Sequence, residues 1–372
     1  MSRNLSLDYL RNFANLSRCL LHASIPYMVT YAPVWPVNEN GSWFFDFAVF
    51  EIHLFVMELF FVIAGFVFAI QLQKQTTLSL FIDRTKRIFL PFLIGLLSLI
   101  PIVLSYFFLQ EFSGKIDINI IKNSYLKGWG LAYDMMYPTA HLWFLYYLLF
   151  FYVFFVFLKK FILKIESISL NLLFLLSVLT SSICMFFMER WIVDNPLTLK
   201  PEIPSLIHYY LFFIIGFILY NSSKHFKGII SNYRRCLIAG TIIGLIAIVP
   251  QLFFEEKSLE YYNLIKLTAI ILYSSSSYFL VFGFWGFFHS LNLADSKILR
   301  YLTDSSYWVY IINMPFVGLI QILLIPFEIS IFIKFLLSFL GALFLSLLSY
   351  EYLIRYGFIG KIINKKRVRS KV

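Results

Sequence analysis

Runs of about 20 apolar residues recur along almost the whole of this 372-residue chain. Each run is long enough to cross a bilayer as an α-helix. Apolar residues make up 60% of the chain and charged residues only 14%. Soluble globular domains contain fewer apolar and more charged residues than this. The sequence therefore predicts an all-α, polytopic membrane protein with about ten transmembrane helices in one bundle. The expected spans lie near 8–29, 50–72, 88–109, 141–158, 168–188, 204–221, 236–254, 262–288, 304–325 and 329–354.

The distribution of Lys and Arg predicts the orientation of these spans. With the N-terminus in the cytoplasm, 22 of the 31 basic residues fall in inside segments and six in outside loops. Such an excess is the positive-inside signal. We therefore expect a multi-pass protein of the cell (inner) membrane with both termini cytoplasmic. The net charge of +11 then reflects orientation in the lipid bilayer and not a nucleic-acid partner.

The chain shows no internal repeat and no appended soluble domain. We expect one transmembrane domain over 1–355, followed by a basic cytoplasmic tail over 356–372. The three cysteines have no metal-type spacing, so neither a metal site nor a disulfide framework is expected.

The first span carries a polar stripe. Its members are Asp8, Arg11, Asn15, Arg18 and His22, spaced by three or four residues, so that they share one face of a helix. Ionisable residues inside a span usually face a bundle interior or an aqueous cavity, and by default they indicate function. The alternative is that the charges form structural pairs and the imidazole bonds a neighbouring helix.

A carboxylate lies at a similar expected depth. His22 is roughly 21 Å along the helix from Asp8, in the outer half of the bilayer, and Glu58 is roughly 12 Å below the outer surface in the second span. A carboxylate beside an imidazole fixes its tautomer and stabilises its protonated form, as a general base requires. We therefore treat a catalytic His22–Glu58 pair as a hypothesis.

Five segments stand out in order along the chain. They are "LDYLRNFANLSRCLLHA" from residue 7, "MELFFVIAGF" from 57, "DRTKRIFLPF" from 83, "HLWFLYYLLFFY" from 141 and "SYWVYIINMPF" from 306. These segments resemble those of the acyltransferase-3 family of integral membrane acyltransferases, including its glucan-succinylating and polysaccharide O-acyltransferase members. Two positions depart from the family pattern, because Ala64 stands where Ser is usual and Asn313 where His often precedes a proline.

The resemblance implies transfer of an acyl group, acetyl or succinyl, from cytoplasmic acyl-CoA to a hydroxyl of an extracytoplasmic glycan or cell-surface polysaccharide. It assigns His22 as the catalytic base and associates Arg84 and Arg87 with the acyl donor. Acyl-CoA is then the donor substrate, and no further cofactor is implied. Direct transfer and a covalent acyl-enzyme both remain open.

The chemistry of the basic residues agrees with a donor site. Arg84 and Arg87 share a helix face, and guanidinium groups bind phosphate bidentately, which suits CoA. Positive-inside anchoring is the alternative. We also predict substrate contacts for Arg11, Arg18 and His141, the last near the acceptor entrance. Asn313 is expected to hydrogen-bond substrate but not to shuttle a proton.

Two other classes of membrane protein compete with an enzyme. A polytopic transporter or flippase for a glycan or small metabolite would also line a cavity with buried charge. Transporters often show repeated halves and paired broken spans, and neither is found in this sequence.

Overall fold

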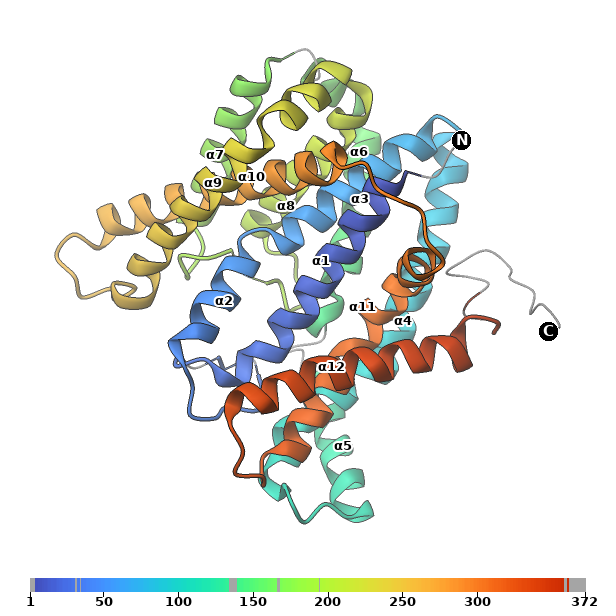
Figure 1. Ribbon diagram of the computed structural model, residues 1–372, viewed down its shortest axis with the longest axis vertical. Coiled ribbons are helices and arrows are strands. Elements are labelled where there is room, and N and C mark those ends of the chain that lie inside the picture. Colours follow the sequence, from blue (N-terminus) through green and yellow to red (C-terminus); the bar gives the residue numbers. More distant parts are fainter. Residues whose placement is uncertain are drawn as a thin grey trace.

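The structure is a computed structural model that describes residues 4–30, 32–33, 35–133, 139–165, 168–193, 195–357 and 360. These residues form helices and connecting loops without any strand, in one elongated bundle (Figure 1). The all-α, polytopic fold predicted from the apolar runs is confirmed. Most of the expected basic tail over 356–372 lies outside the described residues.

Each of the ten predicted spans coincides with helical structure. Short 3₁₀ turns precede α6 and follow α1 and α4, and a π-helical turn, Tyr350–Ile354, follows α12. The helices are α1 Leu5–Ser24, α2 Trp43–His53, α3 Val56–Leu72, α4 Thr77–Leu109, α5 Ile118–Tyr133, α6 Trp143–Ile165, α7 Leu170–Phe186, α8 Ile203–Asn221, α9 Ser223–Phe253, α10 Tyr262–Ser290, α11 Lys297–Leu324 and α12 Ile331–Ser349.

Eight helical segments in the described part of the chain are long and apolar enough to cross a bilayer, α2 and α3 counting as one. Two predicted spans differ from these eight. Helix α7 has only 17 residues, and α1 carries the polar stripe within its 20 residues. The stripe explains the exception, because α1 packs among α3, α10, α11 and α12 and so needs little lipid-facing surface (Figure 1).

Helices α9 and α12 supply much of the surface that contacts lipid. Large apolar side chains are exposed along both, including Ile242, Leu245 and Ile246 on α9 and Phe332 and Ile333 on α12. In water such surfaces would be unfavourable, whereas in a bilayer they match the acyl chains.

Helices α3 and α8 approach each other closely. A Cβ on Gly65 would lie 1.9 Å from the carbonyl oxygen of Phe213, and one on Gly216 would lie 2.0 Å from that of Val62. Only glycine fits at these two crossing points, as is common where membrane helices pack backbone to backbone. The crossing holds α3 rigidly beside the site described below.

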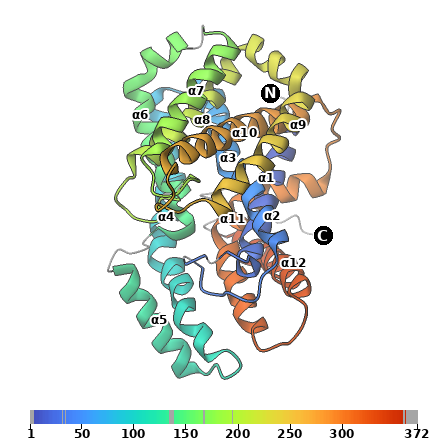
Figure 2. The ribbon, with the colours of Figure 1, turned by 90° about the vertical axis from the view of Figure 1, so that its left-hand side faces the viewer.

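Helix α5 was not predicted from the sequence. It lies along α4 at the end of the bundle away from the N-terminus (Figure 2). A Cβ on Gly128 would be 2.4 Å from the carbonyl oxygen of Pro101, so the absence of a side chain lets α5 dock there. The segment between the third and fourth predicted spans is therefore partly an ordered helix.

Candidate active site

The polar stripe of α1 faces the interior of the bundle, as predicted. Asn15 and Arg18 are buried, with 6% and 3% of their surfaces exposed. One turn further on, His22 is partly buried. Asn12, just off the stripe, donates to the hydroxyl of Thr303 at 3.0 Å and ties α1 to α11. The stripe therefore forms a wall shared with α11.

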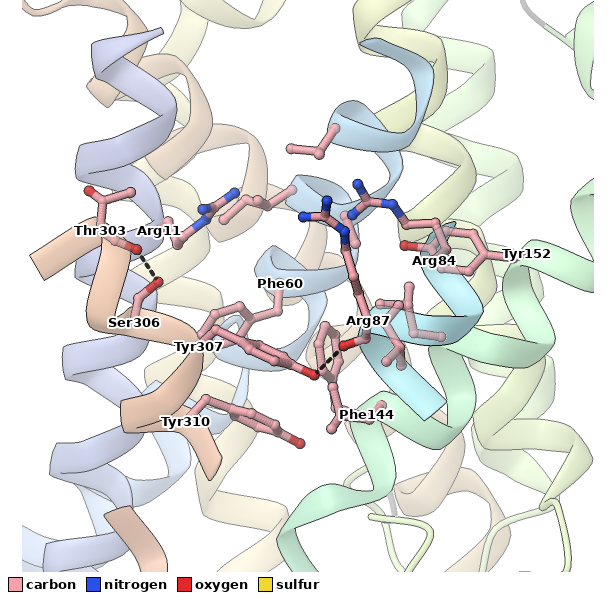
Figure 3. Close-up of a pocket in the computed structure, with 16 residues that line it drawn as sticks. Arg11, Phe60, Arg84, Arg87, Phe144, Tyr152, Thr303, Ser306, Tyr307 and Tyr310 are labelled. Carbon is pink, nitrogen blue, oxygen red and sulfur yellow. Dashed lines mark hydrogen bonds between the residues drawn. The ribbon is translucent and has the colours of Figure 1, made fainter. Parts of the chain in front are cut away.

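A cavity of about 240 Å³ opens beside the N-terminal half of α1. We call it the arginine cavity, because Arg11, Arg84 and Arg87 all line it. Arg11 extends from α1 and the other two from α4, and all three guanidinium groups lie toward the same end (Figure 3). Ala64, where the family pattern has Ser, also lines this cavity.

Asp83 holds the two arginines of α4 in place. Its carboxylate accepts from Nε of Arg87 at 2.9 Å and lies 3.4 Å from Nη2 of Arg84. One carboxylate cannot neutralise two guanidinium groups, and Nε of Arg84 has no hydrogen-bond acceptor in the described part of the chain. This end of the cavity therefore keeps a positive charge and free N–H donors, which suit a phosphate.

Aromatic side chains from α11 form the other end of the arginine cavity (Figure 3). The hydroxyl of Tyr307 donates to the backbone carbonyl of Arg87 at 3.2 Å. The hydroxyl of Tyr310 donates to the backbone carbonyl of His141 at 2.7 Å. The cavity is thus charged at one end and apolar at the other, with Tyr310 at its boundary.

A second cavity of about 110 Å³ lies beside the C-terminal end of α1. We call it the histidine cavity, because His22 and His141 both line it, together with Trp35 and Asn195. The rings of His22 and Trp35 are 5.6 Å apart. The structure therefore brings together the two histidines that the sequence assigned to separate parts of the site.

Gln321 of α11 fixes the position of Trp35. Its Oε1 accepts from the indole nitrogen at 2.8 Å, and its Nε2 lies 3.3 Å from the backbone carbonyl of His22. Gln321 is fully buried, so both bonds are shielded from water. The loop that carries Trp35 is thereby connected to the end of α1.

His141 is held at the start of α6. Its Nε2 lies 2.8 Å from the backbone carbonyl of Ile311 in α11. The preceding residue, Ala140, has a φ of 36°, in the left-handed region that non-glycine residues rarely adopt. Strained backbone of this kind concentrates at functional sites, where the surrounding structure holds it in place.

The predicted pairing of His22 with Glu58 is wrong. Oε1 of Glu58 instead lies 3.3 Å from Nε2 of His208 on α8, and both side chains are fully buried. Depth along the helices suggested the first pairing, but the direction in which Glu58 points places it against α8. The structure therefore separates Glu58 from the histidine cavity.

Asn313 lies inside α11, fully buried, and neither of its side-chain polar atoms has a hydrogen-bond partner within the described chain. It does not line either cavity. The next residue along the chain, Met314, does line the histidine cavity.

Sequence reasoning missed three residues of this region. Trp35 lies in a loop with no periodic pattern. Tyr310 is one of several aromatic residues in an apolar span, and nothing else in the pattern distinguishes it. His208 was not singled out, yet it is the partner of Glu58. A signal existed only for Tyr310, because it lies within the "SYWVYIINMPF" segment already singled out.

Comparison with known proteins identifies the family of the chain. A family model described as an acyltransferase domain, that of the acyltransferase-3 family, matches residues 4–351. No curated protein and no solved structure matches the chain. The match spans both cavities and all of the helices that line them.

Proposed function

Because the chain belongs to the acyltransferase-3 family and is therefore a membrane acyltransferase, we propose that it transfers an acetyl or succinyl group from cytoplasmic acyl-CoA to a hydroxyl of an extracytoplasmic glycan, with His22 as general base. The observation that supports this proposal is the placement of two cavities at opposite ends of α1, one lined by arginines and one by histidines.

The arginine cavity takes the donor in this proposal. Arg11, Arg84 and Arg87 bind the phosphates of CoA, and the aromatic end of the cavity surrounds the thiol arm. Arg11 and His22 are eleven positions apart, roughly 16 Å along the axis of α1. The extended pantetheine arm carries the thioester over that distance, so that CoA itself does not cross the membrane.

The histidine cavity takes the acceptor. The hydroxyl oxygen attacks the thioester carbonyl carbon, and its proton passes to the ring of His22. When the tetrahedral intermediate collapses, the C–S bond breaks and His22 returns the proton to the sulfur of CoA. Trp35 and Trp143, which line this cavity, offer flat apolar faces to a sugar ring.

Orientation follows from the same proposal. The arginine cavity lies at the end of the bundle where α1 begins, and the positive-inside distribution assigns this end to the cytoplasm. The histidine cavity then opens toward the outer face of the inner membrane. Reporter fusions at the two termini test this placement, since both must read as cytoplasmic.

Acyl transfer by the purified protein tests the function. The protein in nanodiscs receives radiolabelled acetyl-CoA or succinyl-CoA, together with envelope glycans from cells that lack the gene. We expect label on the glycan, and loss of that label in His22→Ala. His289→Ala is the matched control, because His289 stacks on Trp285 away from both cavities. Glycan movement without labelling would identify a flippase or transporter instead.

A further inference from the structure

Arg18 is a buried cation without a carboxylate partner in the part of the chain that the structure describes. Its Nη2 lies 3.1 Å from Oδ1 of Asn15, 3.3 Å from the carbonyl of Val309 and 3.8 Å from Sγ of Cys19, all of them neutral acceptors. Among the residues that the structure describes, its Nε and Nη1 have no hydrogen-bond acceptor. The guanidinium group is permanently charged, and the N–H groups on two of its nitrogens therefore remain available as donors.

The unpaired charge of Arg18 raises the free energy of the resting protein. A charge inside a membrane span is costly unless it is paired or hydrated. The ring of Tyr310 lies 5.0 Å from the guanidinium carbon, and this cation–π contact lowers the cost without neutralising the charge. An anion that forms during the reaction would pair with this buried cation and offset its cost.

Arg18 lines neither cavity itself, but it interacts with residues that line each of them. Tyr310, on which it stacks, lines the arginine cavity. His22 and His141 line the histidine cavity, and both interact electrostatically with Arg18. Because His22 is four residues further along α1, it shares a helix face with Arg18. Arg18 therefore links Tyr310 of the arginine cavity to His22 of the histidine cavity.

We propose that Arg18 stabilises the oxyanion of the tetrahedral intermediate, an inference that rests on the acyl-transfer function proposed above. When the acceptor oxygen bonds to the carbonyl carbon, the π electrons move onto the carbonyl oxygen and the proton moves to His22. The N–H groups on Nε and Nη1 of Arg18 then donate to that oxygen. When the C–S bond breaks, the electrons return to the carbonyl, and the sulfur receives the proton from His22.

The position of Arg18 relative to His22 favours an oxyanion over a permanent anion. In the resting protein, a proton on His22 would place two positive charges on one helix face, where they repel each other. A negative charge on the carbonyl oxygen removes this repulsion. Proton transfer to His22 and charge development at the carbonyl therefore support each other in the same step, as transition-state stabilisation requires.

Kinetics of Arg18→Met and Arg18→Lys test the inference, with radiolabelled acetyl-CoA and succinyl-CoA as donors and the envelope glycans as acceptor. For Arg18→Met we expect kcat to fall about 100- to 1,000-fold with both donors, while KM for the donor and binding of CoA stay unchanged. Arg18→Lys keeps a charge and should recover part of kcat. Lys266→Met is the matched control, because Lys266 is another buried cation, bonded to the carbonyl of Met188 outside both cavities.

Several results would overturn the inference. An unchanged kcat in Arg18→Met means that the charge of Arg18 does not contribute to catalysis. A loss of CoA binding means that Arg18 belongs to the donor site. A defect confined to succinyl-CoA means that Arg18 recognises a carboxylate on the acyl chain. If Arg18→Met does not fold, Arg18→Gln decides, because it also removes the charge and a kcat equal to that of the wild type rejects the role. A wild-type protein that transfers no label rejects the proposed function itself.

Discussion

Nε2 of His208 lies 3.3 Å from Oε1 of Glu58, and neither side chain has surface exposed to solvent. The pair joins α3 to α8 roughly two helical turns from the crossing where Gly65 and Gly216 allow close approach. Because Glu58 contacts this imidazole and not His22, its role in the fold is to hold the two helices together. The pairing helps to position α3 beside the candidate site, because Phe60 and Ala64 of α3 line the arginine cavity.

Replacing Glu58 by Ala should destabilise the protein more than replacing it by Gln. Alanine leaves His208 buried without its partner, at a cost of about 1–3 kcal/mol, whereas the glutamine amide can still hydrogen-bond. Thermal unfolding of the purified variants in nanodiscs measures the difference. If Glu58→Ala unfolds at the wild-type temperature but has lost acyl transfer, Glu58 has a chemical role that the structure does not explain.

Replacing Arg84 by Lys should weaken donor binding although the charge is kept. A lysine cannot donate bidentately to phosphate, and losing one charge-assisted hydrogen bond of about 1.5–3 kcal/mol raises KM for acyl-CoA roughly 10- to 100-fold. Lys86→Gln is the matched control, because Lys86 is exposed on the same turn of α4 and does not line the cavity. Equal effects of the two changes would indicate that Arg84 only anchors the helix in the membrane.

Much of the fold could be predicted from the sequence. A 20-residue apolar run has almost no alternative to a helix in a bilayer, so all ten predicted spans coincide with helices. The spacing of the α1 stripe also determines which of its residues share a face, and Arg18 indeed faces inward. Helical periodicity is a local property, and a single sequence records it directly.

The contacts between helices could not be predicted in the same way. Depth along a span follows from residue counting, but the direction of a side chain around the helix axis depends on which neighbours pack there. The His22–Glu58 pairing failed for this reason. Helix α5 and the loop that carries Trp35 were missed because their positions depend on tertiary contacts, such as the bond from Trp35 to Gln321.

Replacing Gln321 by Leu should impair the acceptor side of the reaction alone. The indole N–H of Trp35 then loses its buried acceptor, a loss of about 1–3 kcal/mol, so Trp35 no longer has one fixed position beside His22. We expect KM for the glycan to rise while KM for acyl-CoA stays constant. Gln251→Leu is the matched control, because Gln251 is a buried glutamine bonded to the carbonyl of Trp191 on another part of the bundle. A rise in the donor KM would place Trp35 in the donor path instead.

Removing the ring of Tyr310 should uncouple thioester cleavage from transfer. Tyr310 lines the arginine cavity and bonds to His141, which lines the histidine cavity, so its side chain separates the two. In Tyr310→Ala, water can reach the thioester, and we expect severalfold faster hydrolysis of acyl-CoA in the absence of any glycan. Tyr310→Phe keeps the ring and loses only the hydroxyl bond at 2.7 Å, so its hydrolysis should stay close to the wild-type rate. The measurement is release of free CoA with time, and equal rates for all three proteins would show that another group keeps water from the thioester.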